Sequence, residues 1–494
     1  MRDFNAYDFF IEERNIKSGN SGNNMIISSE EKITYGDFHQ SVSLKYGQFF
    51  RQIDDCFRMG ILLMDSIFQQ ILFWGALRSK ITPGIFSIFE SKDSVLKTIN
   101  KASIDILITD EAHIQLAKEA FDNCSLKRVY IADSDYNLKL AYQNLDLPRK
   151  PKEGRFILFS SGTTGISKGI VHNQIDMKYA AKTYGEQILG LTNKDILYSM
   201  ATLNYGFAFT NSTFQAVYGG ASAIIDKDVD IWHIIDNIKI LKPTVICGVP
   251  VIFDSIAKAA RSSQMDFSFV RLALSSGEKM SENLWDRWHD EFKIAIIEGY
   301  GSVEMLTNVI SNQKDSYCKG SSGKLLQGFE FSFEKSETSE DEPAGVLQVE
   351  GLSISNMMIG SLDNKSKIYR TKDVFKIDED GFFHYCGRKD DMYKVNGVWF
   401  NPLEVEKYIE SFPIVENATV LNVEMEIVAY VVLSDFELFD FLKARSITRW
   451  LKHDKNQTIC PSKYVVVDEL PRNSNGKKLR VEIDKKHILK IIKV

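Results

Sequence analysis

The sequence is poor in proline and cysteine and has no excess of positive charge. Only ten of its 494 residues are proline and 44% are hydrophobic, which excludes a disordered or collagen-like chain. Its 60 Lys and Arg are outnumbered by 66 Asp and Glu, so the chain offers no general attraction to nucleic acid. At roughly 150 residues per unit, the length predicts about three compact units.

The six cysteines lie far apart, without a CxxC pair or a short-spaced Cys/His set that could form a zinc site. We therefore expect reduced thiols and a cytoplasmic protein. The first twenty residues lack the basic and then apolar order of a secretion signal. The longest uncharged stretch, 196–225, contains Asn, Gln and many Ser, Thr and Gly, and this predicts a domain core without membrane insertion.

Short apolar runs alternate with segments of helical length through the first two thirds of the chain, which predicts an α/β body with a parallel or mixed sheet covered by helices. Helices are expected at 66–77 and 281–292. The expected strands lie at 58–66, 82–89, 104–110, 155–161, 196–200, 221–226, 243–249, 271–277 and 294–300.

The last third of the chain has a different pattern. Residues 330–345 are acidic and Ser-rich and predict a solvated loop between strands. After a charge-dense stretch at 387–397, helices are expected at 402–411 and 435–452, and strands at 416–423, 426–433 and 463–470. The division predicted is a large N-terminal domain, 1–388, and a small α+β domain, 389–494.

The segment RFILFSSGTTGISKGIVH, at 155–172, runs from a buried strand into a loop of glycines and hydroxyls that ends at Lys168. Glycines let backbone amides converge on an anion, and the lysine adds a positive charge, so the segment predicts a phosphate cradle. A Walker loop needs a second glycine where this sequence has Ser167, which excludes the kinase and GTPase type. A glycine-rich turn without a ligand is the alternative.

Further motifs follow in order: SSGEKM at 275–280, EGYGSVE at 298–304, YRTKD at 369–373, HYCGRKDDMYKVNG at 384–397 and LPRNSNGKKLR at 470–480. With the glycine-rich loop they resemble the adenylate-forming superfamily of acyl-CoA synthetases, adenylation domains and luciferases. The resemblance implies a large body of mixed sheets and a small mobile C-terminal domain. LSSGEKMSENLWDRW, GYGSVEMLTNVISN and PTVICGVP are most similar to benzoate–CoA ligases.

The resemblance also implies roles for individual residues. Glu304, Thr164 and Lys477 are implied as catalytic residues, with Glu304 as the Mg²⁺ ligand and Lys477 between the substrate carboxylate and the phosphate. The residues implied to bind ATP or AMP are Ser160, Ser161, Gly162, Thr163, Thr164, Gly165, Lys168, Ser276, Gly277, Glu278, Gly299, Tyr300, Gly301, Ser302, Asp373 and Arg388.

The small domain is implied to pivot at Asp390, and Gly397 to lie in the loop past which the thiol arm enters. Two positions depart from the family pattern: Ser167 replaces the usual Pro, and Lys372 replaces the usual Gly. These changes are expected to affect loop stiffness more than charge, because Gly widens and Pro narrows the backbone's options.

The acyl pocket implied by the resemblance comprises Gly206, Phe207, Gly301, Thr307 and Asn308. Benzoate ligases usually have His and an apolar residue in place of Thr307 and Asn308. Polar groups in a closed pocket need partners, so an acid with a second polar group is expected. Ala208 lies near the position where amino-acid-activating relatives keep an Asp, which disfavours an α-amino acid.

The favoured function is an ATP- and Mg²⁺-dependent ligase that converts an aryl or short polar carboxylic acid to an acyl-AMP and then to an acyl-CoA. One alternative keeps this chemistry but loads the phosphopantetheine of a carrier protein. A luciferase-like oxygenase and a non-catalytic nucleotide-binding module are weaker alternatives. The sequence does not separate CoA from a carrier protein as the thiol partner.

Overall fold

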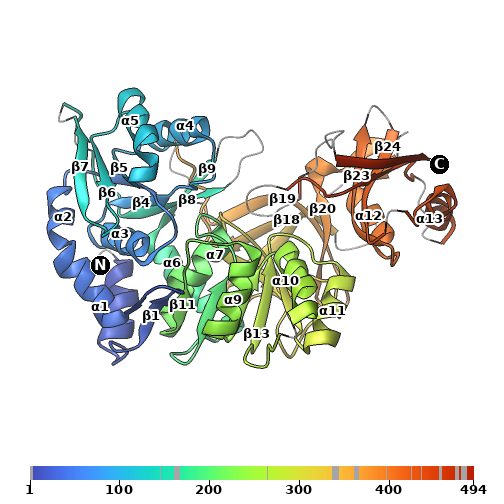
Figure 1. The fold of residues 1–494 in the computed structure, drawn as a ribbon, viewed down its shortest axis with the longest axis horizontal. Helices are drawn as coiled ribbons and strands as arrows, with labels where there is room; N and C mark the ends of the chain where they lie inside the picture. The colour runs from blue at the N-terminus through green and yellow to red at the C-terminus, as the bar shows by residue number, and fades with distance from the viewer. Residues whose placement is uncertain are drawn as a thin grey trace.

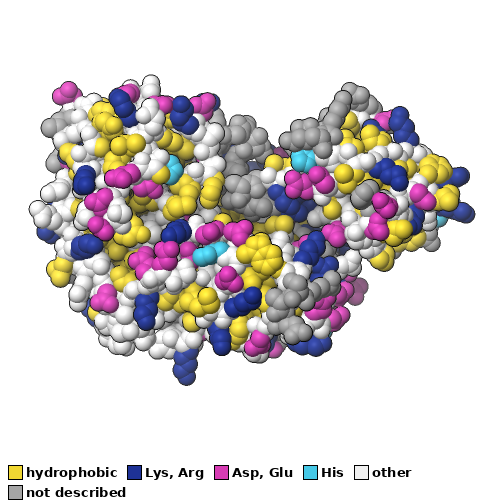
Figure 2. Space-filling view, viewed as in Figure 1, with side chains coloured by type: hydrophobic (Ala, Val, Ile, Leu, Met, Phe, Trp, Pro, Cys, Tyr) yellow, Lys and Arg dark blue, Asp and Glu magenta, His cyan; other side chains and the backbone are white. Residues whose placement is uncertain are grey.

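The computed structural model describes residues 4–144, 146–148, 150–160, 167–263, 265–335, 344–360, 366–395, 398–423, 426–435, 437–454, 459–472, 478–479 and 487–494. A large body holds the N-terminal and central parts of the chain, and a smaller C-terminal unit projects from one end (Figure 1). The surface is hollowed between the two (Figure 2). This is the α/β architecture that the sequence predicts.

The first sheet of the body has seven strands in the order β7-β6-β5-β3-β4-β8-β9, with β7 and β9 antiparallel at its edges. Its strands are β3 (Arg58–Leu62), β4 (Thr82–Ile85), β5 (Ile106–Asp110), β6 (Arg128–Ala132), β7 (Leu138–Gln143), β8 (Arg155–Ser160) and β9 (Lys168–Asn173). The helices of this part of the chain are η1 (Asp8–Ile16), α1 (Tyr35–Gln40), η2 (Ser41–Lys45), α2 (Gly47–Gln52), α3 (Ile67–Arg78), α4 (Lys92–Ala102), η3 (Glu111–His113) and α5 (Ile114–Asn123).

The second sheet has nine strands in the order β16-β15-β14-β13-β12-β10-β11-β1-β2, parallel from β14 to β1. Its strands are β1 (Asn24–Ile27), β2 (Lys32–Thr34), β10 (Ile196–Ser199), β11 (Ser222–Ile224), β12 (Val245–Gly248), β13 (Leu272–Ser276), β14 (Ile296–Ser302), β15 (Thr307–Ser311) and β16 (Lys324–Leu325). The helices are α6 (Gln174–Ala180), η4 (Ala181–Leu189), α7 (Gly206–Phe209), η5 (Thr210–Gln215), α8 (Ala216–Gly219), α9 (Ile231–Leu241), α10 (Pro250–Ser263) and α11 (Glu282–Phe292).

An antiparallel sheet, β17-β18-β19-β20, leads from the body toward the C-terminal unit (Figure 1). Its strands are β17 (Phe329–Lys335), β18 (Ala344–Gly351), β19 (Ile368–Ile377) and β20 (Phe383–Arg388). The following elements are η6 (Lys389–Asp391), β21 (Tyr393–Val395), β22 (Val398–Phe400), α12 (Pro402–Glu410), β23 (Val415–Val423), β24 (Glu426–Leu433), α13 (Phe441–Asp454), β25 (Lys463–Val467) and β26 (Ile488–Lys493). The C-terminal unit has its own hydrophobic core, which includes Val405, Ile409, Val420 and Tyr464.

Capping residues explain where two predicted helices begin. The Ser66 side chain accepts a hydrogen bond from the Gln69 amide at the start of α3, and Ser281 accepts from Leu284 at the start of α11. Helix α3 is buried on nearly every side, as its apolar sequence requires. Helix α11 instead buries one face, with Trp285 and Trp288 against the second sheet's core.

Three local predictions are wrong. Residues 330–335 of the predicted loop belong to strand β17, which pairs residue by residue with β18, and residues 344–345 begin β18. Residues 336–343 lie outside the described residues. The glycines of the EGYGSVE motif, Gly299 and Gly301, predict a tight turn after the preceding strand, but both lie within β14. The helix expected at 435–452 begins only at Phe441.

The uncharged stretch 196–225 forms β10, α7, η5, α8 and β11, and most of it is buried, as predicted for a domain core. Among the described residues, none of the helices has both the length and the apolarity that crossing a bilayer requires.

Candidate active site

The glycine-rich segment closes the hairpin between β8 and β9. Ser160, the last residue of β8, pairs with Lys168, the first residue of β9, and Lys168 is exposed. The Ser167 hydroxyl donates to Glu90 Oε1 at 2.6 Å, so the serine in the usual proline position anchors this end of the loop. The predicted phosphate-binding residues Ser161, Gly162, Thr163, Thr164 and Gly165 lie outside the described residues.

Strands β13, β14 and β15 bring several predicted site residues side by side. Ser276 pairs with Gly299, and Gly301 pairs with Asn308. The Ser276 hydroxyl donates to Asn308 Oδ1 at 2.9 Å. A Cβ on Gly301 would lie 2.2 Å from the Thr307 carbonyl oxygen, so only glycine fits there. Predicted nucleotide and acyl-pocket residues therefore share one edge of the sheet.

Gly277 packs against Tyr205, the residue that precedes the predicted pocket residue Gly206. Its φ of +93° favours glycine, and a Cβ would lie 2.0 Å from the Tyr205 hydroxyl oxygen. Burial, with the Glu278 carboxylate nearby, raises the pKa of Tyr205. The segment 276–278 thus contacts the segment that begins helix α7.

Asp373 is the centre of a polar cluster on β19 and β20. The Tyr300 hydroxyl donates to Asp373 Oδ2 at 2.6 Å, and the Tyr385 hydroxyl lies 3.5 Å from Oδ1. Asp373 pairs across the sheet with Arg388, whose Nε lies 3.6 Å from Oδ1. Burial, reinforced by the Asp373 carboxylate, raises the pKa of Tyr300. A carboxylate held in this way can accept hydrogen bonds from both hydroxyls of a ribose.

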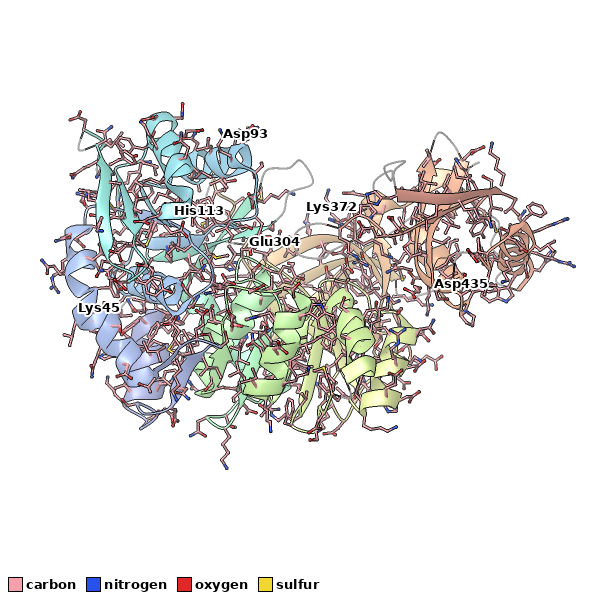
Figure 3. The ribbon with its side chains drawn as sticks, in the orientation of Figure 1. Lys45, Asp93, His113, Glu304, Lys372 and Asp435 are labelled. Atoms are coloured by element: carbon pink, nitrogen blue, oxygen red, sulfur yellow. The ribbon has the colours of Figure 1, made fainter. Side chains whose placement is uncertain are left out.

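Glu304 lies in the turn between β14 and β15, near the middle of the molecule (Figure 3). Its carbonyl accepts from the Ser355 amide at 2.8 Å, and His172 Nε2 lies 2.8 Å from the carbonyl of the preceding residue, Val303. Burial, reinforced by the Glu304 carboxylate, raises the pKa of Tyr369. His172 and Tyr369 were not predicted from the sequence to lie near Glu304, although both belong to quoted motifs.

The buried Glu298 and the half-buried Lys279 influence each other electrostatically beside the same strands. Glu298 Oε1 accepts from the Met280 amide at 2.9 Å. Burial raises the pKa of Glu298 to about 7, and burial lowers the pKa of Lys279. Neither was singled out from the sequence, because nothing in the motif indicates that Glu298 points inward.

The C-terminal unit reaches the site through Glu278. This carboxylate accepts from the backbone amide of Lys478 and lies 3.4 Å from Arg472 Nη1. The Lys478 ammonium turns the other way and donates to the Ala418 carbonyl at 2.8 Å. Lys477, the predicted catalytic residue, lies outside the described residues, but its neighbour in the chain is fixed on Glu278.

The predicted hinge residue Asp390 is exposed in η6. Its carboxylate lies 2.6 Å from the Lys372 ammonium, and this contact is the main reason that the pKa of Asp390 is lowered. Lys372 lies near the C-terminal unit in Figure 3. Gly397 lies outside the described residues.

All five residues predicted to line the acyl pocket are among the described residues. A Cβ on Gly206 would lie 3.1 Å from Val303 Cγ2, which brings α7 next to the Glu304 turn. Phe207 packs against the core around β14. Thr307 is buried, and its hydroxyl has no hydrogen-bond partner among the residues that the structure describes.

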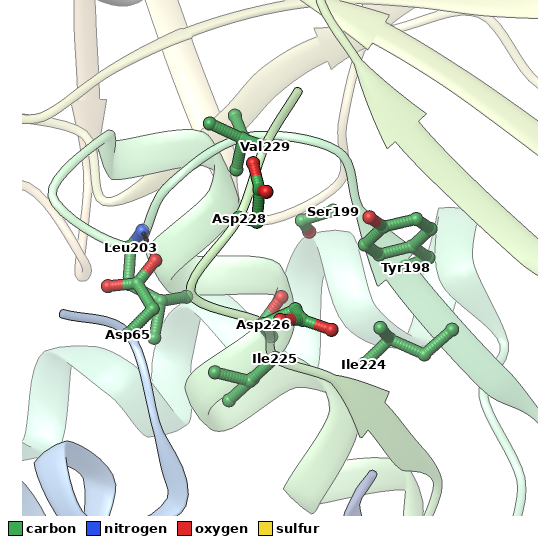
Figure 4. A pocket seen from close by; sticks show the side chains of 11 residues that line it. Asp65, Tyr198, Ser199, Leu203, Ile224, Ile225, Asp226, Asp228 and Val229 are labelled. Atoms are coloured by element: carbon green, nitrogen blue, oxygen red, sulfur yellow. Dashed lines mark hydrogen bonds between the residues drawn. The ribbon is translucent and has the colours of Figure 1, made fainter. Parts of the chain in front are cut away.

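A separate cavity lies at the carboxyl ends of β10 and β11 (Figure 4). Its lining includes Asp65, Asp226 and Asp228. Asp65 Oδ2 accepts from the Leu203 amide at 2.7 Å, and burial raises the pKa of Asp65 to about 6. This hydrogen bond joins the loop before Gly206 to the segment between β3 and α3.

Comparisons with known proteins identify the family. The model of the AMP-binding enzyme family matches residues 14–357, and that of the AMP-binding enzyme C-terminal domain matches residues 404–477. This chain belongs to the AMP-binding enzyme family. The first match covers more than half of the chain and includes β13, β14 and β15.

Curated relatives match most of the length of this AMP-binding enzyme. The chain is 26% identical to a 4-hydroxybenzoate–CoA/benzoate–CoA ligase of Rhodopseudomonas palustris, over 97% of this chain and 93% of that protein. It is 31% identical to an anthranilate–CoA ligase of Pseudomonas aeruginosa, over 67% of each. The crystal structure of the anthranilate CoA ligase AuaEII with anthranoyl-AMP shares the fold, with a TM-score of 0.84, 22% identity and 96% coverage of both chains.

Proposed function

We propose that this AMP-binding enzyme is an ATP-dependent carboxylic acid–CoA ligase that acts through an acyl-AMP. One observation carries the proposal: Arg472 and Lys478, which flank the basic loop 473–477 that contains Lys477, are both held by Glu278. Glu278 directly follows Ser276 and Gly277, so the loop is anchored at the predicted nucleotide site. The relatives named above, which are aryl acid–CoA ligases, support the same activity.

The first half reaction joins two anions. A carboxylate oxygen of the acid attacks the α-phosphorus of ATP, the bond to the bridging oxygen breaks, and pyrophosphate leaves with its electron pair. No nucleophilic side chain is needed, because the substrate supplies the attacking oxygen. An ammonium at Lys477 would stabilise the charge that develops between carboxylate and phosphate.

Glu304 is the proposed ligand of Mg²⁺. A hard carboxylate oxygen suits this ion, and the turn that carries it is fixed through the Val303 and Glu304 carbonyls. When bound, Mg²⁺ would neutralise phosphate charge. Asp373, with Tyr300 and Arg388 around it, is the proposed ribose acceptor.

The second half reaction needs the basic loop to withdraw, so that a thiol can attack the acyl carbonyl and release AMP. We propose that a small domain, 389–494, rotates about Asp390 relative to a large domain, 1–388. Gly397 is proposed to face the thiol arm after this rotation. CoA is the acceptor favoured by the relatives; loading of a carrier protein has no observation in its favour here.

The proposed substrate is an aryl carboxylic acid with a hydroxyl or amino substituent. The Thr307 hydroxyl is buried next to the Asn308 amide and has no hydrogen-bond partner among the described residues. Leaving this hydroxyl unpaired against an unsubstituted ring would cost free energy, whereas a hydroxyl or amino substituent can pair with it. Relatives that act on hydroxybenzoate or on anthranilate support this class.

A pyrophosphate-release assay over a panel of acids tests both proposals. Full-length enzyme with ATP and Mg²⁺ should form AMP and an acyl-CoA only when acid and CoA are both present. Hydroxy- and aminobenzoates should exceed benzoate in kcat/KM by roughly 10-fold or more. Failure of every acid to release pyrophosphate would refute the ligase, whereas preference for benzoate would refute only the polar substrate.

We also propose a cytoplasmic location. The support is the state of the cysteines: all six are free thiols in the structure, as is usual in a reducing compartment.

A further inference from the structure

Cys318, Asp378 and His384 come together beside the hairpin between β19 and β20. Their ligand atoms, one sulfur, one carboxylate oxygen and one imidazole nitrogen, all lie within 4.8 Å of one another. Across the described part of the chain, no other three or more His, Cys, Asp and Glu side chains meet this closely. The three residues are half-buried and are 60 or more positions apart between the cysteine and the other two.

We infer that Cys318, Asp378 and His384 form a binding site for a divalent transition-metal ion of the Zn²⁺ type. Thiolate, imidazole and carboxylate are the three ligand types that zinc uses, and three protein ligands leave a fourth position for water. Thiolate and carboxylate together neutralise the charge of the ion. Mg²⁺ and Ca²⁺ are disfavoured because they prefer sites made of oxygen atoms alone.

The carboxylate is already oriented by its own turn. Asp378 Oδ1 accepts from the amides of Phe382, at 2.9 Å, and Asp380, at 3.1 Å. This leaves Oδ2 directed at His384 Nε2, at 2.7 Å. Neighbouring ligand atoms on a tetrahedral zinc lie roughly 3.4 Å apart, so the pair needs to open by only about 0.7 Å to admit an ion.

The cysteine is held by its backbone. The Cys318 amide donates to Asn312 Oδ1 at 2.9 Å, and its carbonyl accepts from the Ser321 hydroxyl at 2.7 Å. The loop that carries Cys318 is then joined to the hairpin, because the Ser322 amide donates to the Phe383 carbonyl at 2.8 Å. Both sides of the site are therefore positioned by bonds that do not involve the ligand atoms, as preorganised metal sites require.

Two lysines close to Cys318 in the chain, Lys319 and Lys324, already have partners of their own. The Lys319 ammonium is paired with Asp286 at 2.6 Å, and the Lys324 ammonium lies over the Phe382 ring, 4.4 Å from its centroid. A bound ion would link the loop before β16 to the hairpin of β19 and β20. Strands β19 and β20 also carry Asp373 and Arg388 of the predicted ribose site. A bound ion would therefore restrict the motion of these strands and of the segment that leads to the C-terminal unit.

Cobalt binding tests the site directly, because a thiolate on Co²⁺ gives a charge-transfer band that oxygen ligands do not give. Chelator-treated full-length protein, without ATP so that Glu304 has no nucleotide to share a metal with, is titrated with Co²⁺ and then with Zn²⁺. We expect one Co²⁺ per chain with a thiolate band, loss of the band on addition of Zn²⁺, and a rise in Tm with either metal.

Cys318→Ser should abolish the thiolate band, and His384→Gln should weaken Co²⁺ binding by about 100-fold or more. Cys124→Ser and His453→Gln, which change the same residue types at the end of α5 and in α13, should behave like the wild type. Circular dichroism and metal-free Tm establish that the variants fold. Binding without a thiolate band, or equal binding by wild type and Cys318→Ser, would overturn the proposal whether or not the ligase activity is found.

Discussion

The Lys372 ammonium lies 2.6 Å from the carboxylate of Asp390, the predicted hinge residue. Both side chains are more than half exposed, at 62% and 56%. Lys372 stands where the family resemblance leads one to expect Gly. From the sequence, this replacement is expected to change loop stiffness more than charge. In the structure, Lys372 instead pairs its positive charge with the predicted hinge residue in this orientation of the C-terminal unit.

Replacing Lys372 by Gly should alter the balance between the two half reactions. Without the ion pair the hinge is freer to rotate, so thioester formation should gain relative to pyrophosphate exchange. An exposed pair is worth at most about 1 kcal/mol, so the ratio should change by no more than ~5-fold and the change should shrink at high salt. Lys389→Ala, a neighbouring charge change, is the control; an equal effect of both variants would contradict the role of the pair.

Lys477→Ala should slow adenylation by roughly 10²- to 10³-fold, because an oriented charge donor is lost at the reacting phosphate. The matched control is Lys478→Ala, which keeps the backbone bond to Glu278 and removes the contacts of the ammonium with the Ala418 carbonyl and the Glu410 carboxylate. It should stay within about 10-fold of the wild type. Isotope exchange between pyrophosphate and ATP measures both, and wild-type exchange by Lys477→Ala would exclude the proposed role.

The buried carboxyl of Glu298 should make stability depend on pH. Its pKa of about 7 in the folded chain lies above its ordinary 4.5, so the folded state binds the proton more tightly. The free energy of unfolding should therefore fall as pH rises from about 4.5 to about 7, and Glu298→Gln should lack this loss. Urea unfolding at pH 5 and pH 8 should show the variant gaining roughly 1 to 3 kcal/mol on the wild type between the two.

The Gln side chain keeps an oxygen for the Met280 amide, so the comparison isolates the ionisation. Glu330→Gln, an exposed substitution on β17, should leave the pH profile unchanged. Parallel profiles of Glu298→Gln and the wild type would show that Glu298 does not titrate in this range.

Gly277→Ala should weaken ATP binding, since its Cβ would lie 2.0 Å from the Tyr205 hydroxyl oxygen and its φ is positive. Adding Tyr205→Phe removes that oxygen and leaves a nearest ring contact of 3.3 Å, so the double variant should recover part of the lost affinity. The KM for ATP of the four combinations forms a double-mutant cycle. Purely additive effects would show that the close approach has no consequence.

Thr307→Val should change substrate preference with little change in pocket volume. The variant removes the buried hydroxyl, so kcat/KM for hydroxy- and aminobenzoates should fall about 10-fold while that for benzoate is kept or rises. Adenylation rates over the same acids provide the measurement. A uniform change for all acids would indicate that Thr307 does not contact the ring substituent.

The candidate site residues were predicted from the order of the motifs and from resemblance, because the glycines, acids and lysines of these motifs occur in a fixed order along the chain. Gly277 and Gly301 proved to be glycines for a spatial reason, the close approach of Tyr205 and of the Thr307 carbonyl. Tyr369 and His172 were missed because aromatic and imidazole side chains within strands usually pack in a core. Only pairing between distant strands brings them to the Glu304 turn.

The sequence by itself determined the α/β class, the position of most strands in the body, the caps of α3 and α11 and the membership suggested by the ordered motifs. These depend on local periodicity and on residue types a few positions apart. The tertiary structure alone decided that Lys372 meets Asp390, that Glu278 holds the chain beside Lys477 and that Cys318 meets His384. The reason is physical: such contacts join residues that are 18 to 200 positions apart, and only the packing of whole sheets and units sets the distance between them.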